Sequence, residues 1–167
     1  MDETFNEDSA SIKGCRYSNE EYPGPRRYYM KRIGIITCAN TTKILDCPLS
    51  PCLRDFYDRK GEFARYKGLD TELAGIISCQ GCLGGLAPEA ILSKANSLVH
   101  YGADNIHLAY CLVVLCPYLS KYITILKEAY PKVEIIPGTH EPHASPEETR
   151  RSISRFLRIK VGRNIVP

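Results

Sequence analysis

Apolar residues gather into four short runs along this chain, and a segment with helical spacing follows each run. The runs cover about residues 32–37, 73–78, 105–110 and 133–136, and they are rich in isoleucine, leucine and valine. Each run is apolar at consecutive positions rather than at every second one, which is typical of strands buried on both faces of a parallel sheet. The pattern therefore predicts four strands that alternate with helices.

Helix-terminal signals mark the segments after the first two runs. Ser50 is suited to cap a helix in which Pro51 is the first residue, and this places Cys52 in the first turn. A second helix is expected at about residues 89–100, where apolar residues recur at core spacing and Gly102 is a natural stop.

The segments after the third and fourth runs carry similar signals. Pro117 is expected to begin a third helix, which Pro131 ends. Ser145 and Glu148 have the spacing of a capping box for a fourth helix.

This order of strands and helices indicates the fold class. Strands alternating with helices form a parallel sheet with helices on both faces, and right-handed crossovers leave few topologies. We predict a three-layer α/β sandwich, Rossmann-like or flavodoxin-like, with a four-stranded parallel sheet in the order 2-1-3-4. The α/β domain is expected to cover residues 32–162, with an N-terminal extension at 1–31 and a tail at 163–167.

Composition and charge exclude several classes of protein. The 167 residues include no apolar stretch long enough to span a membrane, and the acidic, polar start does not resemble a signal peptide, so a cytoplasmic location is expected. The net charge of +3 is mild, and the basic residues form no single cluster. We therefore expect neither a nucleic-acid partner nor a membrane partner. The extension either packs on the domain or mediates contacts in a homodimer.

Cysteine is the residue type that points to chemistry. The chain has 8 cysteines in 167 residues, about 5%, which is below the ~8–10% of a small disulfide scaffold. In a cytosolic chain, clustered cysteines more often indicate metal or redox chemistry. Cys38, Cys79 and Cys111 directly follow the first three strands, and His140 lies shortly after the fourth. Cys15 falls in the extension, outside this pattern, and is expected to be incidental.

The predicted topology gathers these residues at one edge of the sheet. Ligands of open α/β sheets bind beyond the carboxyl ends of the strands, where the strand order switches. Cys52 and Cys116 are placed at helix N-termini, where the helix dipole favours the thiolate. The candidate metal ligands are Cys38, Cys47, Cys52, Cys79, Cys82, Cys111, Cys116 and His140, with His143 as an additional candidate. His107, inside a strand, is expected to be a core residue, and His100 a solvated or capping residue near a helix end.

Several separated motifs together resemble the CGGC-domain family, over about residues 31–140. They include Thr37-Cys38, the Cys47 and Cys52 pair, Phe56 to Tyr66, Cys79-Gln80-Gly81-Cys82, Tyr101 to Asp104, Ile106 to Cys111, Cys116-Pro117 and Gly138-Thr139-His140. The resemblance implies a metal-binding protein without an established reaction. One departure is central, because Gln80 replaces the first glycine of the Cys-Gly-Gly-Cys motif. If that position needs a left-handed backbone, glutamine is less suited to it.

The leading interpretation is a metal centre of cysteine and histidine ligands. Zinc takes four thiolate or imidazole ligands, and an iron–sulfur cluster takes four cysteines, so the sequence leaves the metal undecided. It also leaves open whether the site is catalytic or structural, as in a binding or scaffold protein.

Two enzyme classes stand beside the metal interpretation. Cys79 and Cys82 have the spacing of a thiol–disulfide redox pair. A phosphate-handling enzyme would use the glycines after the second strand. It is the weaker alternative, because no Walker lysine follows Gly84-Gly85 and no arginine lies six residues after Cys38 or Cys79.

Overall fold

The structure is a computed structural model, and it describes residues 30–82, 88–142, 145, 147–148 and 150–151. The expected extension with Cys15, apart from its last two residues, lies outside the described residues, as do the expected tail and the candidate ligand His143.

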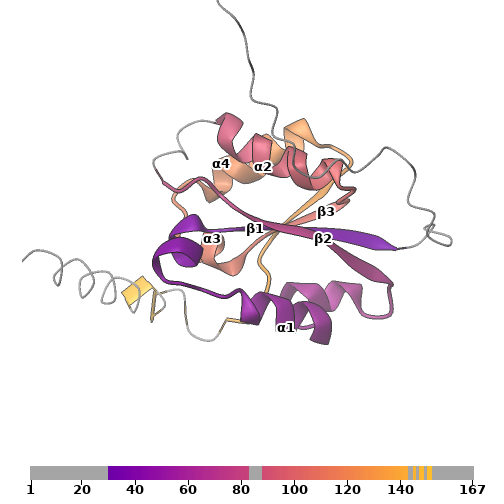
Figure 1. Ribbon diagram of the computed structural model, residues 1–167, viewed down its shortest axis with the longest axis horizontal. Coiled ribbons are helices and arrows are strands. Elements are labelled where there is room, and N and C mark those ends of the chain that lie inside the picture. The colour runs from indigo at the N-terminus through magenta and orange to yellow at the C-terminus, as the bar shows by residue number, and fades with distance from the viewer. Residues whose placement is uncertain (1–29, 83–87, 143–144, 146, 149, 152–167) are drawn as a thin grey trace, which may run out of the picture.

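A parallel sheet forms the centre of the described chain (Figure 1). Its strands are β1 (Lys31–Thr37), β2 (Thr71–Ser78), β3 (Asn105–Leu108) and β4 (Glu134–Pro137). They are ordered β2-β1-β3-β4, and every neighbouring pair is parallel. The predicted α/β class and the predicted strand order are both confirmed.

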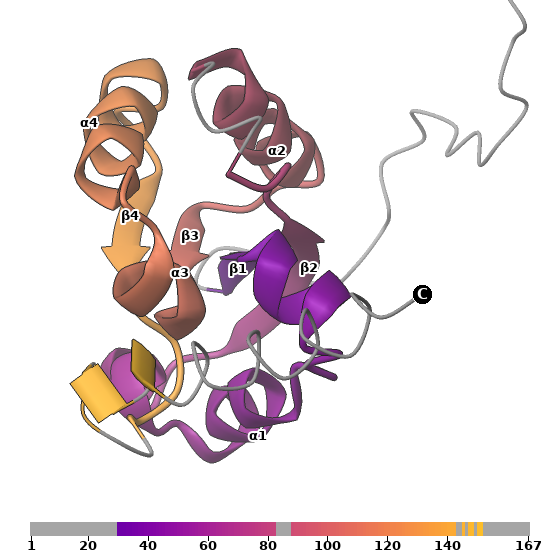
Figure 2. The same ribbon diagram turned by 90° about the vertical axis from the view of Figure 1, so that its left-hand side faces the viewer.

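Helices cover both faces of this sheet, as Figure 2 shows. The helices α2 (Pro88–His100) and α4 (Leu119–Ala129) pack side by side on one face. The other face is covered by α1 (Ser50–Asp58) and by a short 3-10 helix, η2 (Gly61–Tyr66). The chain thus forms the three layers that the alternating pattern predicts.

The alternation of side chains along β1 explains how one strand serves two cores. Ile33 and Ile35 pack with the aromatic residues of α1 and η2, whereas Ile36 packs in the α2–α4 core. Gly34 faces α2, where a Cβ atom would lie only 2.9 Å from Leu98 Cδ1. Glycine at this position therefore lets α2 approach the central strand closely.

The structure corrects the expected end of the third strand. β3 ends at Leu108, two residues earlier than predicted, and a short helix, α3 (Tyr110–Leu115), follows at once. The amide of Ala109 makes a last ladder bond to Ile36 O, and the Ala109 carbonyl then accepts from the Leu112 amide, which begins the helix. Cys111 therefore lies in a helical turn rather than directly at a strand exit.

Helix starts were predicted less accurately than strands. The residue before α1 is Leu49, in a left-handed conformation, and no side chain caps this helix, so the predicted cap at Ser50 is wrong. Pro117 lies in a turn, and α4 begins two residues later at Leu119. The predicted capping box is confirmed, with Ser145 N donating to Glu148 Oε2 at 2.9 Å and Glu148 N donating to Ser145 Oγ at 3.2 Å.

One short helical turn had not been predicted: Asn40–Ile44 forms a single π-helical turn, η1, shortly after β1. The helical spacing after Ser50 continues to Phe63, and the structure divides this segment, because α1 ends before the left-handed Arg59 and η2 begins at Gly61. In the part of the chain that the structure describes, the search for long apolar helices finds none that could cross a membrane.

Candidate functional site

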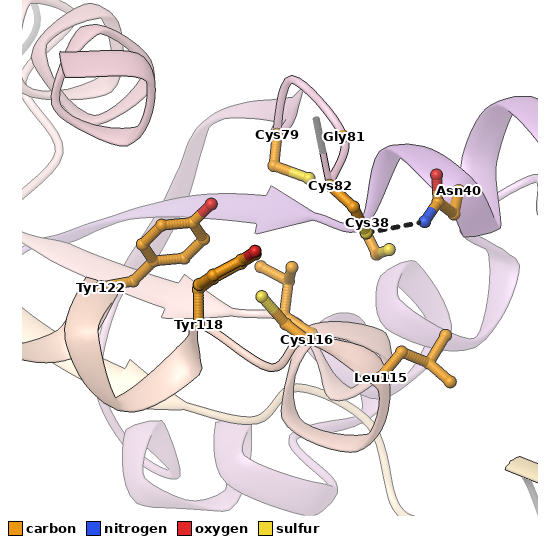
Figure 3. Close-up of a pocket in the computed structure, with 10 residues that line it drawn as sticks. Cys38, Asn40, Cys79, Gly81, Cys82, Leu115, Cys116, Tyr118 and Tyr122 are labelled. Atoms are coloured by element: carbon orange, nitrogen blue, oxygen red, sulfur yellow. Dashed lines mark hydrogen bonds between the residues drawn. The ribbon is translucent and has the colours of Figure 1, made fainter. Parts of the chain in front are cut away.

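A pocket opens at the carboxyl edge of the sheet, on the side of α2 and α4 (Figure 3). Four cysteines line it: Cys38, Cys79, Cys82 and Cys116. The remaining lining residues are Asn40, Gly81, Leu112, Leu115, Tyr118 and Tyr122. Cys38 and Cys79 directly follow β1 and β2. Four of the eight predicted metal ligands thus line this one pocket.

Cys38 and Cys79 form the inner part of the pocket. The register of β1 and β2 pairs Thr37 with Ser78. The residues that follow them, Cys38 and Cys79, therefore lie side by side at the ends of the two strands. The Ala39 amide donates to Cys79 Sγ at 3.3 Å. The neighbouring Cys38 thiol and this amide favour the Cys79 thiolate and lower its pKa to about 6. The Cys79 sulfur and burial in turn raise the pKa of Cys38 well above the usual range.

Cys82 lies at the mouth of the same pocket. It is exposed, and its Sγ accepts a hydrogen bond from Asn40 Nδ2 at 3.2 Å (Figure 3). Gly81 carries the turn between the motif cysteines with φ +88°, and no atom of the described residues lies within 4 Å of a Cβ built on it. Gln80 does not adopt a positive φ. The substitution at Gln80 is therefore compatible with the loop, because the left-handed position is the second glycine of the motif.

Cys116 overturns one expectation about helix dipoles. It lies at the carboxyl end of α3, where its amide donates to Leu112 O at 2.9 Å, and three residues before α4 begins. It is therefore not placed at a helix N-terminus, and the predicted dipole stabilisation of its thiolate does not apply. Burial raises the pKa of the Cys116 thiol instead.

A second group of thiols lies around Thr139, outside the pocket lining. Cys52 Sγ is 3.4 Å from Thr139 Oγ1, which also accepts the Tyr110 amide at 3.1 Å. Cys111 Sγ accepts the Cys38 amide at 3.2 Å. Burial raises the pKa of Cys111 to about 12 and also raises that of Cys52, so the expectation of a stabilised thiolate at the start of α1 is wrong. These two thiols are held protonated by their surroundings.

The last two predicted ligands lie apart from the pocket. Cys47 is half-buried, and its amide donates to Thr41 O at 3.1 Å. His140 is 2.9 Å from Glu141 O through Nδ1, and its ring packs 5.1 Å from that of Tyr110. Asp55 of α1 accepts the Glu141 amide at 2.8 Å and so anchors the loop that carries His140.

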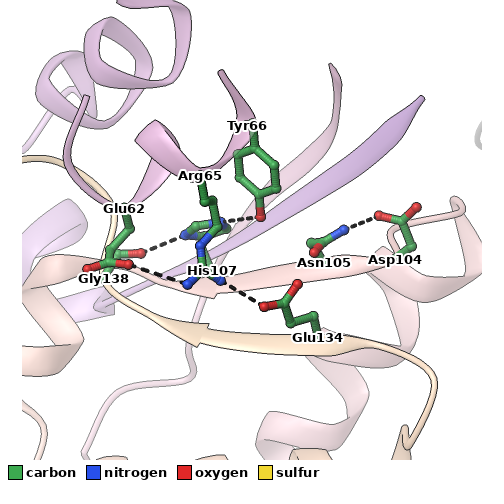
Figure 4. Close-up of polar contacts among 8 residues, drawn as sticks. All are labelled: Glu62, Arg65, Tyr66, Asp104, Asn105, His107, Glu134 and Gly138. Atoms are coloured by element: carbon green, nitrogen blue, oxygen red, sulfur yellow. Dashed lines mark hydrogen bonds and ion pairs between the residues drawn. The ribbon is translucent and has the colours of Figure 1, made fainter. Parts of the chain in front are cut away.

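A buried histidine lies beneath the edge on the opposite face of the sheet (Figure 4). His107 is fully buried, as the sequence predicted, with Nδ1 2.8 Å from Gly138 O and Nε2 2.8 Å from Tyr66 Oη. A carbonyl can only accept, so Nδ1 carries the proton and Nε2 accepts from the tyrosine. Burial lowers the pKa of His107 to about 4, and the nearby Arg65 charge acts in the same direction. His100 is exposed at the end of α2, as expected.

Sequence reasoning missed the non-cysteine residues of the site. Asn40, Tyr118 and Tyr122 line it, yet none has a motif of its own, whereas Thr139 beside it belongs to the Gly138-Thr139-His140 motif. Asn40 alone carried a usable signal, because it lies two residues beyond Cys38, where β1 has ended. Tyr122 follows a helical core pattern, and only its contact with the pocket marks it as part of the site.

The donor set has the chemistry of a thiophilic metal site, although the side chains do not converge on one point. Within the described ranges, no three cysteine, histidine, aspartate or glutamate side chains are grouped closely enough to hold a metal ion. The four pocket thiols come from three segments of the edge, because Cys79 and Cys82 share one turn, and all are free of disulfides. Thiolates are the ligands that zinc and iron–sulfur clusters take.

Taken together, the fold and the site define an α/β protein with a cysteine-lined pocket at the carboxyl edge of a parallel sheet. The comparison with protein families identifies the group within this class. The profile of the CGGC domain matches residues 32–140, more than half of the chain, and the chain therefore belongs to the CGGC domain family. No match was found among curated proteins or among solved structures.

Proposed function

We propose that this protein binds a thiophilic metal centre, zinc or an iron–sulfur cluster, through Cys38, Cys79, Cys82 and Cys116. The observation that carries the proposal is the lining of one pocket by four free cysteines. Membership of the CGGC domain family supports it, because the resemblance to that family implies metal binding.

The surroundings of the pocket suit thiolate ligands. Amides and side-chain N–H groups donate to two of the sulfurs, from Ala39 to Cys79 and from Asn40 to Cys82. Such donors to a ligating sulfur orient it and disperse its negative charge, as outer-shell contacts do in metal sites. The apolar walls from α3 and α4 limit the access of water to the centre.

Binding requires the four thiols to turn towards a common point. Each cysteine has three staggered χ1 positions, so its sulfur can move without a change in the backbone. Cys82 is at the mouth and is the least constrained of the four. Metal binding would release the protons of the thiols, because the thiolate is the ligand.

The other predicted ligands have different positions in this proposal. Cys47, Cys52, Cys111 and His140 do not line the pocket, and we assign them no contact with the metal. Cys52 and Cys111 support the edge through Thr139 and the Cys38 amide.

The test is metal and acid-labile sulfide content after strictly anaerobic purification, together with a visible spectrum. Wild-type protein should retain a full metal complement, whereas Cys82→Ser and Cys116→Ser should lose most of it. Iron with sulfide and a brown colour would identify a cluster, and zinc without colour would identify a single-ion site.

Cys47→Ser is the matched control, because it removes a half-buried thiol that does not line the pocket. It should keep the wild-type metal content. Full metal content in both pocket variants, or loss of metal from the control alone, would refute the proposed ligand set. Circular dichroism of each variant checks that the fold is intact.

Thiol–disulfide chemistry at Cys79 and Cys82 is the second candidate. It is favoured by the hydrogen bonds that the Cys79 sulfur accepts. Metal-free wild-type protein whose thiols oxidise rapidly would favour this candidate.

A further inference from the structure

The ends of β1 and β2 bring two thiols into the geometry of a disulfide. The paired register runs without a shift from Gly34 and Gly75 to Thr37 and Ser78, and the Cys79 amide continues the ladder by donating to Thr37 O at 2.8 Å. Neighbouring strands are about 4.8 Å apart. A disulfide needs Cα atoms roughly 4.4–6.8 Å apart, so residues opposite each other on these strands meet that requirement.

The two side chains also point the same way. Residues opposite each other in register project to the same face of a sheet, and Cys38 and Cys79 both line the pocket on the α2–α4 side (Figure 3). Both thiols are free, and both belong to the buried cluster on that face. Bond formation between them therefore needs no movement of the strands.

Cys82 is held differently, although it is the neighbour of Cys79 in the motif. The turn at Gly81 separates the two residues, and Cys82 Sγ accepts from Asn40. Cys38 is thus the thiol opposite Cys79 in the strand register, although it lies 41 residues away in the chain.

We propose that Cys79 and Cys38 act as a dithiol that reduces small apolar or aromatic disulfides in the metal-free protein. Leu112, Tyr118 and Tyr122 supply the apolar wall against which such a substrate would lie. The activity goes beyond metal binding and does not depend on it, although both would use the same pocket.

The reaction is a pair of thiol–disulfide exchanges. The Cys79 sulfur attacks one sulfur of the substrate R–S–S–R, the substrate bond breaks, and the first R–S⁻ leaves and takes a proton. The Cys38 sulfur then attacks Cys79, the mixed disulfide breaks, and the second R–S⁻ leaves with the proton from Cys38. Two electrons pass to the substrate, two R–SH are released, and the protein keeps a Cys38–Cys79 disulfide that a small dithiol can reduce.

The experiment uses the full chain, reduced, freed of metal with a chelator and kept anaerobic. It is mixed with less than one equivalent of dithiodipyridine, an aromatic disulfide whose product, thiopyridone, is measured by its absorbance. A dithiol releases two thiopyridones per reagent consumed and keeps no adduct, whereas a single thiol releases one and keeps the other half as an adduct. Peptide mapping of the wild-type product under acid conditions should find the Cys38–Cys79 bond.

Variants assign the two steps. Cys38→Ala should release one thiopyridone and keep an adduct on Cys79, whereas Cys47→Ser, which removes a thiol outside the pocket lining, should still release two. A wild-type map that joins Cys79 to Cys82, or a product with a stable adduct and no internal bond, would overturn the proposal. The peptide map of the wild-type protein needs no variant. It therefore tests the proposal even if the Cys38→Ala protein does not fold.

The result is separable from the test of metal binding. Metal content is measured on protein purified without chelator, and the disulfide map is measured on metal-free protein. A protein that holds no metal but forms the Cys38–Cys79 bond would refute the proposed function alone. A protein that holds metal but forms no such bond would refute this inference alone.

Discussion

Lowering the pH should destabilise the protein through the buried imidazole of His107. Its pKa is lowered from 6.5 to about 4 in the folded state, mainly because burial disfavours the charged ring. Between these two values the unfolded chain binds a proton that the folded chain does not. Folding is therefore favoured most above pH 6.5, and stability falls as the pH drops towards 4.

The size of the effect follows from the difference between the two pKa values. Each unit is worth about 1.4 kcal/mol, so the full loss is about 3 kcal/mol, reached near pH 4. Between pH 7 and pH 5 the linkage relation gives a loss of about 2 kcal/mol. Because the ring is fully buried, solvent does not screen this contribution substantially.

Urea unfolding of metal-free protein at pH 7 and pH 5 measures this loss. His107→Gln removes the titration, while an amide can still donate and accept at the position. The variant should be less stable at pH 7 but should lose about 2 kcal/mol less than the wild type on acidification. His100→Gln, which removes an exposed imidazole at the end of α2, is the matched control and should follow the wild type. An equal loss in His107→Gln and wild type would refute the reasoning.

Two further substitutions test how the edge of the sheet is supported. Tyr66→Phe removes the hydroxyl that donates to the buried imidazole and leaves its nitrogen unsatisfied, so thermal unfolding should show a loss of about 1–3 kcal/mol. Tyr101→Phe, at an exposed ring, should change stability little. Gly61→Ala should destabilise more than Gly68→Ala, because both have positive φ but only the first would place a Cβ 2.5 Å from Thr139 O. Equal losses at the two glycines would show that the close contact is unimportant.

The strands and their order were predictable because the physical signals are local. Each of the four short apolar runs, such as 32–37, is best explained as a buried strand, because a helical segment follows it. Right-handed crossovers between parallel strands then limit the topology. Helix starts were less predictable. Ser50 has the residue type of a cap, but the left-handed Leu49 begins the helix without a side-chain hydrogen bond. Such local backbone states depend on tertiary contacts that a sequence window does not contain.

The site was predictable as a place but not as a set of contacts. Cys38 and Cys79 follow adjacent strands, so strand order alone brings them together. Cys116 was misplaced because the short helix α3 between Tyr110 and Leu115 has too few residues to give a periodic signal. The pairing of Cys79 with Cys38 needed the register, which no spacing along the chain encodes.

The turn at Gly81 has a consequence for how such proteins are recognised. Its φ is +88°, and among the described residues no atom lies near a Cβ built on it, so the turn requires the backbone freedom of glycine rather than a small side chain. The preceding position, Gln80, has no such requirement and is exposed. A text search for the literal string Cys-Gly-Gly-Cys would pass over this chain. The stereochemically defined signature is Cys-x-Gly-Cys, in which the residue at the free position is exposed and needs no left-handed backbone.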